Sequence, residues 1–467
     1  MRFTDRFVLS VLNAGLSTGA DYCEIYYQDD VSTAYTRRYH KVSNVSSGQT
    51  RGVGIRLIKN DQVVYGYSSD LSEKALLKLA KDLSFGFDGK RNVLVRSLHE
   101  RKGNPVNPVR IGHKGMSRKE KLAYLERGEK TAFAYSDKII DVITNLSEDD
   151  EHIEIYNSDG IKASDDRIRT KVTISVTAKQ DGQVQQGYQT KGLSEGLELL
   201  SEVDFVEMAQ KAAKTSIDLF SAVSAPSGEL PVVLANGSGG VLFHEACGHP
   251  LEGSAVSKGL SPFSGKLGQK IASDIVSAFD DGTEPNGWGS QAIDDEGNLP
   301  TKNQLIKDGI LNLYMLDRFT AKRIGDDLQP TGCCRREDYT CIPTTRMTNT
   351  YIANGKSTRD EIIKSVDFGI YCVDFMGGQV ETNTDQFVFT SNVAYLIEDG
   401  KVTKMIKPVS LIGYGYEILN RITMIADDGY NEDGYCGASS GTCCVETGQP
   451  TLLISKILVG GQGGKSE

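Results

Sequence analysis

The sequence predicts an α+β protein with two domains, and three observations lead to this expectation. The chain has 467 residues, more than one ordinary hydrophobic core accommodates. Hydrophobic residues make up 39% and charged residues 24%, which is a normal globular balance. The segment 221–229 is small and polar, and the sequence becomes rich in glycine after it. We therefore expect domains over 1–227 and 228–467.

The N-terminal domain is expected to combine helices with an antiparallel sheet. Phe7, Val8, Val11 and Leu12 recur at helical spacing, which predicts an amphipathic first helix rather than an export signal. Strands are predicted at 21–28, 52–58, 63–67, 138–146, 152–157, 168–178 and 182–189, and helices at 71–83, 118–134 and 205–220. The proline-containing segment 103–108 reads as a connection, since proline continues neither a helix nor a central strand.

The C-terminal domain is expected to be mostly antiparallel β-structure that carries a metal-binding helix. Asp308-Gly309 and Asp399-Gly400 each separate two strand-like runs, and Asp-Gly in that position is a strong hairpin signal. The predicted hairpins join 304–306 to 310–314 and 393–397 to 401–405.

Charge and cysteine content restrict the function classes. The net charge of −10 repels phosphate backbones, so we expect no nucleic-acid partner. No apolar run approaches the length of a membrane span, so we expect no membrane association. Nine cysteines, an odd number with two adjacent pairs, indicate free thiols in a reducing compartment. We therefore expect a cytoplasmic location.

The segment Phe243-His-Glu-Ala-Cys-Gly-His249 carries two of the six histidines. Neutral imidazoles are good zinc ligands, and the glutamate between them, Glu245, is placed to act as general base toward the attacking water. The alternative interpretation is two ordinary histidines that flank a helix end. The preceding loop 236–240 lacks the lysine and Ser/Thr of a phosphate-binding loop.

The spacing of the two histidines constrains the local backbone. His244 and His249 are five residues apart, about 140° around an ideal α-helix, whereas the usual spacing of four gives about 40°. Both can reach one ion only if the helix widens into a π-type turn or ends between them. Gly248 and Pro250 favour a distorted or ending helix.

Two histidines leave a catalytic zinc site one protein ligand short. The glycine-rich segment 434–444 contains Cys436, Cys443 and Cys444 and is the expected donor region. Taken singly, each of these cysteines is more often a small buried hydrophobic residue than a ligand.

Several motifs together resemble the TldD/PmbA family of metallopeptidases, also called modulators of DNA gyrase, in its metal-binding TldD branch. They are Leu242-Phe-His-Glu-Ala-Cys-Gly-His-Pro-Leu-Glu-Gly253, Phe263-Ser-Gly-Lys-Leu-Gly-Gln269, Ala292-Ile-Asp-Asp-Glu-Gly297, Arg335-Arg-Glu337, Arg346-Met-Thr-Asn-Thr-Tyr351, Gly377-Gly-Gln-Val380, Tyr395-Leu-Ile-Glu398 and Gly448-Gln-Pro-Thr-Leu452. The resemblance covers essentially all of 229–467 and, more weakly, the N-terminal strands.

The resemblance implies a zinc ion (Zn²⁺) held by two histidines and one cysteine, with the glutamate of the motif as base. Carried over, these are His244, His249 and Glu245. An ungapped count back from Gly448 gives Cys436 as the third ligand, whereas the Gly-Thr-Cys that is usual in the family ends here at Cys443. We assign Cys436, with Cys443 as the alternative.

The resemblance also implies a peptidase acting on small or unfolded peptides, in peptide maturation or antitoxin degradation. It implies a homodimer or a heterodimer with a metal-free paralogue. The N-terminal domain is expected to serve as a scaffold for the substrate or for the dimer. Arg335, Arg336 and Glu252 lie in matching motifs; they either line the site or form structural ion pairs.

Three rival functions remain for comparison. One is a non-catalytic peptide-binding protein or partner subunit, although a pure binder needs no base such as Glu245. A thiol oxidoreductase is disfavoured because no Cys-x-x-Cys occurs in the sequence. A DNA-acting role lacks a recognisable motif and conflicts with the acidic charge.

Overall fold

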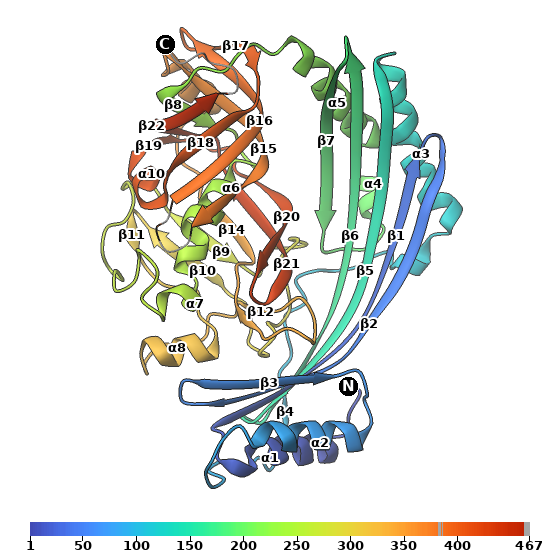
Figure 1. Ribbon diagram of the computed structural model, residues 1–467, viewed down its shortest axis with the longest axis vertical. Helices are drawn as coiled ribbons and strands as arrows, with labels where there is room; N and C mark the ends of the chain where they lie inside the picture. The colour runs from blue at the N-terminus through green and yellow to red at the C-terminus, as the bar shows by residue number, and fades with distance from the viewer. Residues whose placement is uncertain (382–383, 385, 462–467) are drawn as a thin grey trace.

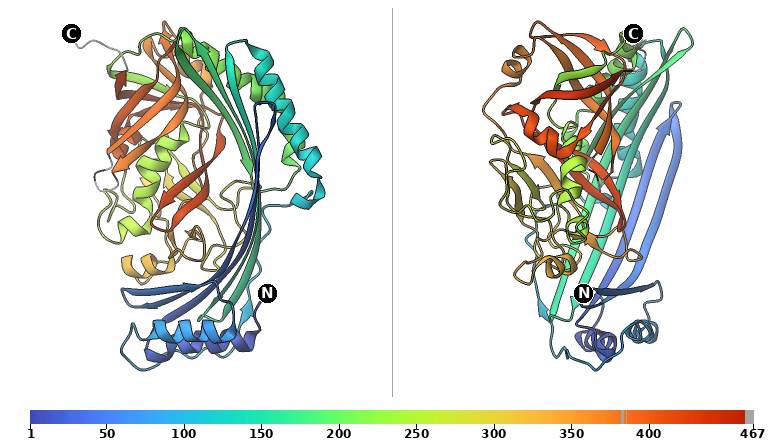
Figure 2. Two further views of the ribbon diagram at one scale, coloured as in Figure 1. Left: turned by 45° about the vertical axis from the view of Figure 1, so that its right-hand side comes forward. Right: turned by 60° about the vertical axis from the view of Figure 1, so that its left-hand side comes forward.

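The computed structural model describes residues 1–381, 384 and 386–461. Helices and mostly antiparallel sheets make up the molecule, which confirms the predicted α+β class. A tall sheet from the N-terminal half stands beside a rounder, β-rich C-terminal half (Figure 1). Viewed from other sides, the tall sheet bends around the C-terminal half (Figure 2). The boundary between 227 and 228 stays a prediction.

The tall sheet has the strand order β3-β2-β1-β5-β6-β4, and β7 pairs with β6. Its strands are β1 (Tyr22–Arg38), β2 (Lys41–Lys59), β3 (Gln62–Ser68), β4 (His99–Glu100), β5 (Ile139–Asn157), β6 (Ile161–Gln180) and β7 (Gln183–Leu193). The predicted hairpin across Asn60-Asp61 is present as β2 and β3. β7 is an edge strand on the side of the C-terminal half, where its Gly192 N–H donates a hydrogen bond to Asp433 on β20 (Tyr430–Ala438).

One difference from the prediction lies in β5, where two expected strands, 138–146 and 152–157, form a single strand of 19 residues. The acidic stretch between them stays in the sheet because its carboxylates find cations. Glu148 pairs with Lys121 at 2.6 Å, and Glu151 lies 3.7 Å from Arg167 on the neighbouring strand. Periodicity cannot anticipate partners that come from other elements.

The helices of the N-terminal half form two groups: α1 (Asp5–Gly15) with α2 (Glu73–Ser84), and α3 (Arg118–Tyr135) with α4 (Leu199–Glu202) and α5 (Phe205–Asp218). The predicted helices at 71–83, 118–134 and 205–220 are thus confirmed. α1 and α2 cover the lower end of the sheet, and α3 and α5 cover its outer face (Figure 1). No helix within the described ranges has the length and apolar character needed to cross a membrane.

The C-terminal half contains two larger sheets and a short ladder, β12 (Cys334–Arg335) with β13 (Thr344–Thr345). The first sheet runs β11 (Ile310–Leu311), β10 (Lys302–Lys307), β9 (Ala278–Asp281), β14 (Asn349–Ile352), β21 (Gly441–Gln449) and β20 (Tyr430–Ala438). The second runs β15 (Phe368–Glu381), β8 (Gly228–Leu234), β22 (Leu452–Gly461), β18 (Val409–Tyr414), β16 (Gln386–Glu398) and β17 (Lys401–Ile406), with β19 (Ile422–Ile425) on β22. Because β15 also pairs with β16, five strands of the second sheet close into a ring.

Short helices and tight turns complete this half. The helices are α6 (Gly240–Phe243), α7 (Gly253–Val256), α8 (Arg318–Ile324), α9 (Arg359–Lys364) and α10 (Gly415–Arg421). Both predicted Asp-Gly hairpins are confirmed: Asp308 and Asp399 have φ values of 48° and 51°, and a glycine with positive φ follows each. This left-handed pair is the backbone of a type I′ turn.

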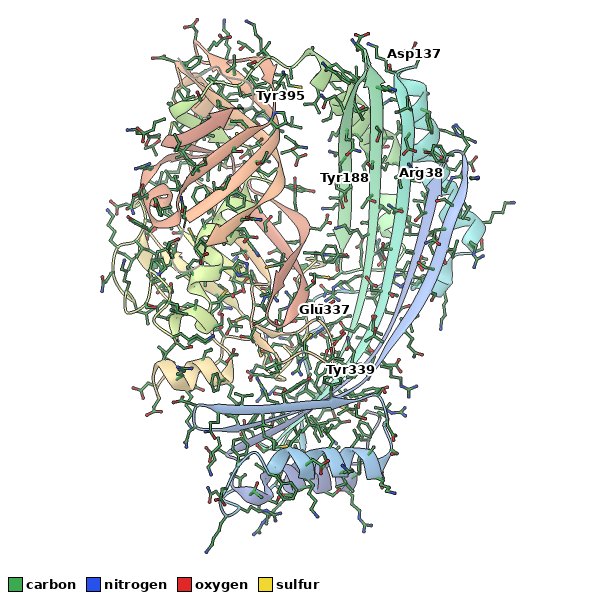
Figure 3. The ribbon with its side chains drawn as sticks, in the orientation of Figure 1. Arg38, Asp137, Tyr188, Glu337, Tyr339 and Tyr395 are labelled. Carbon is green, nitrogen blue, oxygen red and sulfur yellow. The ribbon has the colours of Figure 1, made fainter. Side chains whose placement is uncertain are left out.

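Buried ion pairs join the two halves at the base of the sheet. Glu24 on β1 accepts hydrogen bonds from Arg56 and from Arg336, each at 2.8 Å. None of the three side chains is more than 2% exposed. Tyr339 lies just above β3, at the base of the tall sheet (Figure 3), and a Cβ on Gly52 would lie 2.2 Å from its ring. Tyr65 also donates to the Tyr339 carbonyl at 2.6 Å. These contacts fix the sheet against the C-terminal half.

Candidate metal centre

Three side chains from separate elements converge beside the ring of strands. His244 and His249 flank one helical turn, and Cys436 lies on β20. One potential ligand atom from each residue lies within 4.8 Å of the other two, and all three side chains are buried. The three residues named from the sequence therefore come together, whereas Cys443 lies outside this group.

The backbone between the two histidines is a π-helical turn, His244–Gly248. This is one of the two local structures that the five-residue spacing requires. α6 leads into the turn, and a short 3-10 turn that contains Pro250 follows it. The two imidazole rings consequently face one region, with centroids 5.2 Å apart and ring planes at 84°.

Neighbouring groups orient each imidazole. Thr350 Oγ1 lies 3.3 Å from Nδ1 of His244, and Nε2 of His244 is buried without a hydrogen-bond partner. Glu252 Oε1 lies 3.3 Å from Nδ1 of His249. Both rings thus present Nε2 inward while Nδ1 is occupied, an arrangement typical of metal-ligating histidines.

The thiol of Cys436 completes the cluster. Its Sγ lies 3.1 Å from Nε2 of His249. Cys443 is directly opposite Cys436 in the β20–β21 ladder, but its Sγ lies 3.8 Å from Nη1 of Arg346. The sulfurs of Cys436 and Cys443 therefore have different neighbours.

Glu245 lies beside the cluster and faces open space. Its Oε2 is 3.7 Å from Nε2 of His249, and its side chain is 24% exposed. Burial raises the pKa of Glu245, against the opposing charges of His249 and Arg346. Burial lowers the pKa of His244, whereas the Glu252 carboxylate and the Cys436 thiol raise that of His249 above its usual value despite burial.

Two cavities meet at Glu245. The larger, of about 740 Å³, lies between strands β6 and β7 and the C-terminal half, and His244 and Glu245 form part of its wall. Tyr188 on β7 lines it from the sheet side (Figure 3). The smaller cavity, of about 520 Å³, is lined by Glu245, His249 and Glu252.

Carboxylates line the larger cavity, and burial or a neighbouring cation reduces their negative charge. Asp433 is neutralised by Lys171, whose Nζ lies 2.8 Å away. Burial and the nearby Asp374 raise the pKa of Glu432 to about 7. Asp374 itself accepts from Ser238 Oγ at 3.2 Å.

The donor set fits a catalytic zinc ion. Two imidazole nitrogens and one thiolate are three of the ligands that zinc prefers, and three protein ligands leave one position open. The unpartnered, fully buried Nε2 of His244 is the strongest sign, because a buried polar atom without a partner is costly. The neighbouring Glu245 carries a carboxylate, a group of the type that can accept a proton.

Arg335 and Arg336, which were named from the sequence, form hydrogen bonds that stabilise the fold. Arg336 donates to Glu24 at 2.8 Å and to the Asp295 carbonyl at 3.0 Å, and Arg335 donates to the Met347 carbonyl at 2.8 Å. Glu252, by contrast, contacts His249. Sequence reasoning gave no role to Thr350, although this residue lies in the motif that begins at Arg346.

Three family models match almost the whole chain. Residues 23–85, 113–220 and 227–461 match domain 1, the central domain and the C-terminal domain of PmbA/TldA metallopeptidases. This chain belongs to the PmbA/TldD metallopeptidase family. The family resemblance inferred from the motifs is therefore confirmed.

Curated relatives of this PmbA/TldD member carry metalloprotease names. The metalloprotease TldD homologue of Buchnera aphidicola is 35% identical over 98% of this chain and 97% of its own length. The homologue of Haemophilus influenzae is 35% identical over 97% and 96%. A zinc metalloprotease TldD homologue of Saccharolobus solfataricus is 24% identical over 95% and 97%.

Solved structures share the fold at low sequence identity. A Bacteroides thetaiotaomicron protein named for modulation of DNA gyrase aligns with a TM-score of 0.78 at 17% identity, over 98% of both chains. TldE from Thermococcus kodakarensis aligns with a TM-score of 0.77 at 18% identity, over 97% of this chain and 99% of TldE. These likenesses concern the fold alone.

Proposed function

We propose that this chain is a zinc-dependent peptidase that hydrolyses small or unfolded peptides, as in peptide maturation or antitoxin degradation. His244, His249 and Cys436 would hold the zinc ion, and Glu245 would act as general base. The observation that carries the proposal is the convergence of the three ligand atoms within 4.8 Å, with Glu245 beside them. The zinc metalloprotease name of one relative agrees with the choice of metal.

The chemistry divides between the metal and the protein. When bound, zinc supplies a Lewis acid that polarises the scissile carbonyl and lowers the pKa of water. Glu245 accepts a proton from the attacking water and passes it to the leaving nitrogen, because its carboxylate faces the space where the two cavities meet. Thr350 and Glu252 keep the two imidazoles in the required orientation.

The shape of the site supports a flexible substrate. Glu245 lies in the wall of a cavity between the tall sheet and the C-terminal half, and such an enclosed position favours a narrow, flexible substrate over a folded domain. An extended peptide is narrow enough to enter, and the edge strands β7 and β20, each paired with one neighbouring strand, offer backbone hydrogen-bonding groups. Small or unfolded peptides are therefore the substrates that this geometry favours.

We extend the proposal to assembly and location. The chain would form a homodimer or a heterodimer with a metal-free paralogue; the shared fold of TldE makes such a paralogue a compatible partner. No disulfide joins any of the nine cysteines, all of which lie in the described part of the chain, and this suits the reducing cytoplasm. Size measurement of the purified protein, alone and with a co-expressed paralogue, tests the assembly.

The central experiment separates metal binding from catalysis. Glu245→Gln should retain zinc but lose nearly all cleavage of an unstructured peptide mixture, since the amide cannot accept the proton. His244→Ala and His249→Ala should lose the zinc. Elemental analysis and mass spectrometry of the peptides measure the two properties.

Glu73→Gln is the matched control, because Glu73 is exposed in the first turn of α2. It should behave as the wild type in both measurements. Near wild-type cleavage by metal-loaded Glu245→Gln excludes Glu245 as base. A wild-type protein that binds zinc and peptide without cleaving it would instead indicate the peptide-binding subunit.

A further inference from the structure

The segment 346–350 contacts three parts of the metal centre, although none of its residues is a candidate ligand. Arg346 contacts the hairpin that carries Cys436, Met347 contacts the turn between the histidines, and Thr350 contacts His244. We propose that Arg346, Met347 and Thr350 are positioning residues that set the geometry of the two histidines and the cysteine. The inference rests on the proposed zinc site. It identifies the residues that hold the three zinc ligands in position.

Arg346 holds the hairpin formed by β20 and β21. Its guanidinium is fully buried and donates to the Cys436 carbonyl at 2.5 Å, the Gly441 carbonyl at 2.7 Å and Ser440 Oγ at 3.0 Å. The planar guanidinium reaches both strands at once, which a lysine ammonium cannot reproduce. Because β20 is an edge strand, these bonds fix a part of the sheet that has a neighbour on one side only.

A second support holds the tip of the same hairpin. Glu337 accepts from the Thr442 N–H at 2.8 Å, and its own N–H donates to the Ser440 carbonyl at 2.8 Å. Glu337 lies just below the hairpin (Figure 3). Glu337 and Arg346 thus both bind the tip of the hairpin. Cys436 joins this support to the histidines, because its carbonyl accepts a hydrogen bond from Arg346 and its Sγ lies 3.1 Å from Nε2 of His249.

Met347 supports the π-helical turn. A Cβ built on Gly248 would lie 2.1 Å from Met347 Sδ, so the sulfur fills the space beside the residue before His249. The Met347 backbone is fixed in turn, since its carbonyl accepts from Arg335 at 2.8 Å. The thioether therefore determines how closely the turn approaches β14, and with it the position of His249.

Thr350 selects the tautomer of His244. Its hydroxyl lies 3.5 Å from Asp280 Oδ1 and 3.3 Å from Nδ1 of His244. An ionised carboxylate only accepts, so the hydroxyl donates to Asp280 and accepts from the Nδ1–H of His244. The lone pair of His244 is then on Nε2, which points into the metal centre.

The test measures metal binding, so it does not depend on peptidase activity. Arg346→Lys and Thr350→Val should each weaken zinc binding about 10- to 100-fold, the usual effect of groups that orient metal ligands. Chelator competition gives the zinc affinity. In the cobalt-substituted protein, Arg346→Lys should also weaken the sulfur-to-cobalt absorption band, while Thr350→Val should keep it, because Arg346 contacts the hairpin that carries Cys436 and Thr350 contacts His244.

Two controls separate positioning from general destabilisation. Arg56→Lys changes an equally buried arginine that binds Glu24 and Glu296, and Thr442→Val changes an exposed threonine on β21. Both should keep wild-type zinc affinity, even if Arg56→Lys lowers the thermal midpoint. If Arg346→Lys does not fold, Ser440→Ala removes one contact of Arg346 and should weaken zinc binding by a smaller factor.

The outcomes distinguish this inference from the proposed function. A wild-type protein that binds neither zinc nor cobalt contradicts the zinc site itself. Wild-type zinc binding combined with unchanged affinity in Arg346→Lys and Thr350→Val overturns the positioning role alone. A lower thermal midpoint with unchanged affinity and an unchanged cobalt spectrum also overturns it, because those residues would then be structural only.

Discussion

The Sγ of Cys436 lies 3.1 Å from Nε2 of His249, although 187 positions separate the two residues in the sequence. Cys443 is the direct cross-strand neighbour of Cys436, and yet its sulfur approaches Arg346. Both thiols are buried, so exposure does not distinguish them. Their surroundings do, because only Cys436 shares a group of potential ligand atoms with both histidines among the residues that the structure describes.

Substituting the two cysteines separately tests this distinction. Cys436→Ser should release zinc, because a neutral hydroxyl is a poor replacement for a thiolate ligand. Cys443→Ser should retain it at wild-type stoichiometry. Elemental analysis after dialysis against a weak chelator measures both. The opposite pattern would show that the displaced Gly-Thr-Cys, rather than the spacing from Gly448, marks the ligand.

Local patterns were sufficient to predict much of the fold. The helix that contains Phe7 and Leu12 and the two Asp-Gly hairpins follow from short-range periodicity and turn chemistry, and all are present. The five-residue histidine spacing also limited the backbone to two choices, of which the structure has the π-helical turn. These features depend on neighbours in the sequence.

Features that depend on distant residues were not predictable in the same way. The continuous β5 relies on Lys121 and Arg167, which lie on other elements. The contact of Thr350 with His244 joins residues 106 positions apart. No periodicity or spacing encodes such a pair; its only signal in the sequence was that Thr350 falls in a motif shared with the family.

Gly248 offers a test of the packing beneath the π-helical turn. Gly248→Ala places a Cβ 2.1 Å from Met347 Sδ, so either the Met347 side chain or the π-helical turn must shift. We expect a loss of about 1–3 kcal/mol in stability, the usual cost of overpacking, and weaker zinc binding. Denaturant unfolding of the metal-free protein and chelator competition measure these effects. Gly112→Ala is the control, since a Cβ on Gly112 would meet no other atom within 4 Å.

Glu24 tests the connection between the two halves. Glu24→Ala leaves the buried guanidinium groups of Arg56 and Arg336 without a shared carboxylate. Removing one partner of a buried ion pair costs about 3–5 kcal/mol, so the midpoint of urea unfolding should fall markedly. The exposed pair Lys78–Asp82 provides the comparison, and Asp82→Asn should change stability by less than about 0.5 kcal/mol. Equal effects of the two substitutions would contradict a linking role for Glu24.

Asp30 should make the stability of the folded protein depend on pH. Burial, with the neighbouring carboxylates of Glu151 and Asp149, raises the pKa of Asp30 to about 7. Asp30 lies directly opposite Glu151 in the β1–β5 ladder, which is an unfavourable position for two like charges. The folded protein therefore keeps a proton that the unfolded chain loses near pH ~4.

Stability linked to Asp30 consequently falls as pH rises from about 4 to about 7, because the folded state binds more protons over that range. Asp30→Asn removes this dependence. The variant should be more stable than the wild type above pH ~7, by on the order of 1 kcal/mol after solvent screening is allowed for, and should lose that advantage toward pH ~4. Urea unfolding across this range measures the difference, with Asp61→Asn in the exposed β2–β3 turn as control. A difference between wild type and Asp30→Asn that does not vary with pH would show that Asp30 does not titrate in this range.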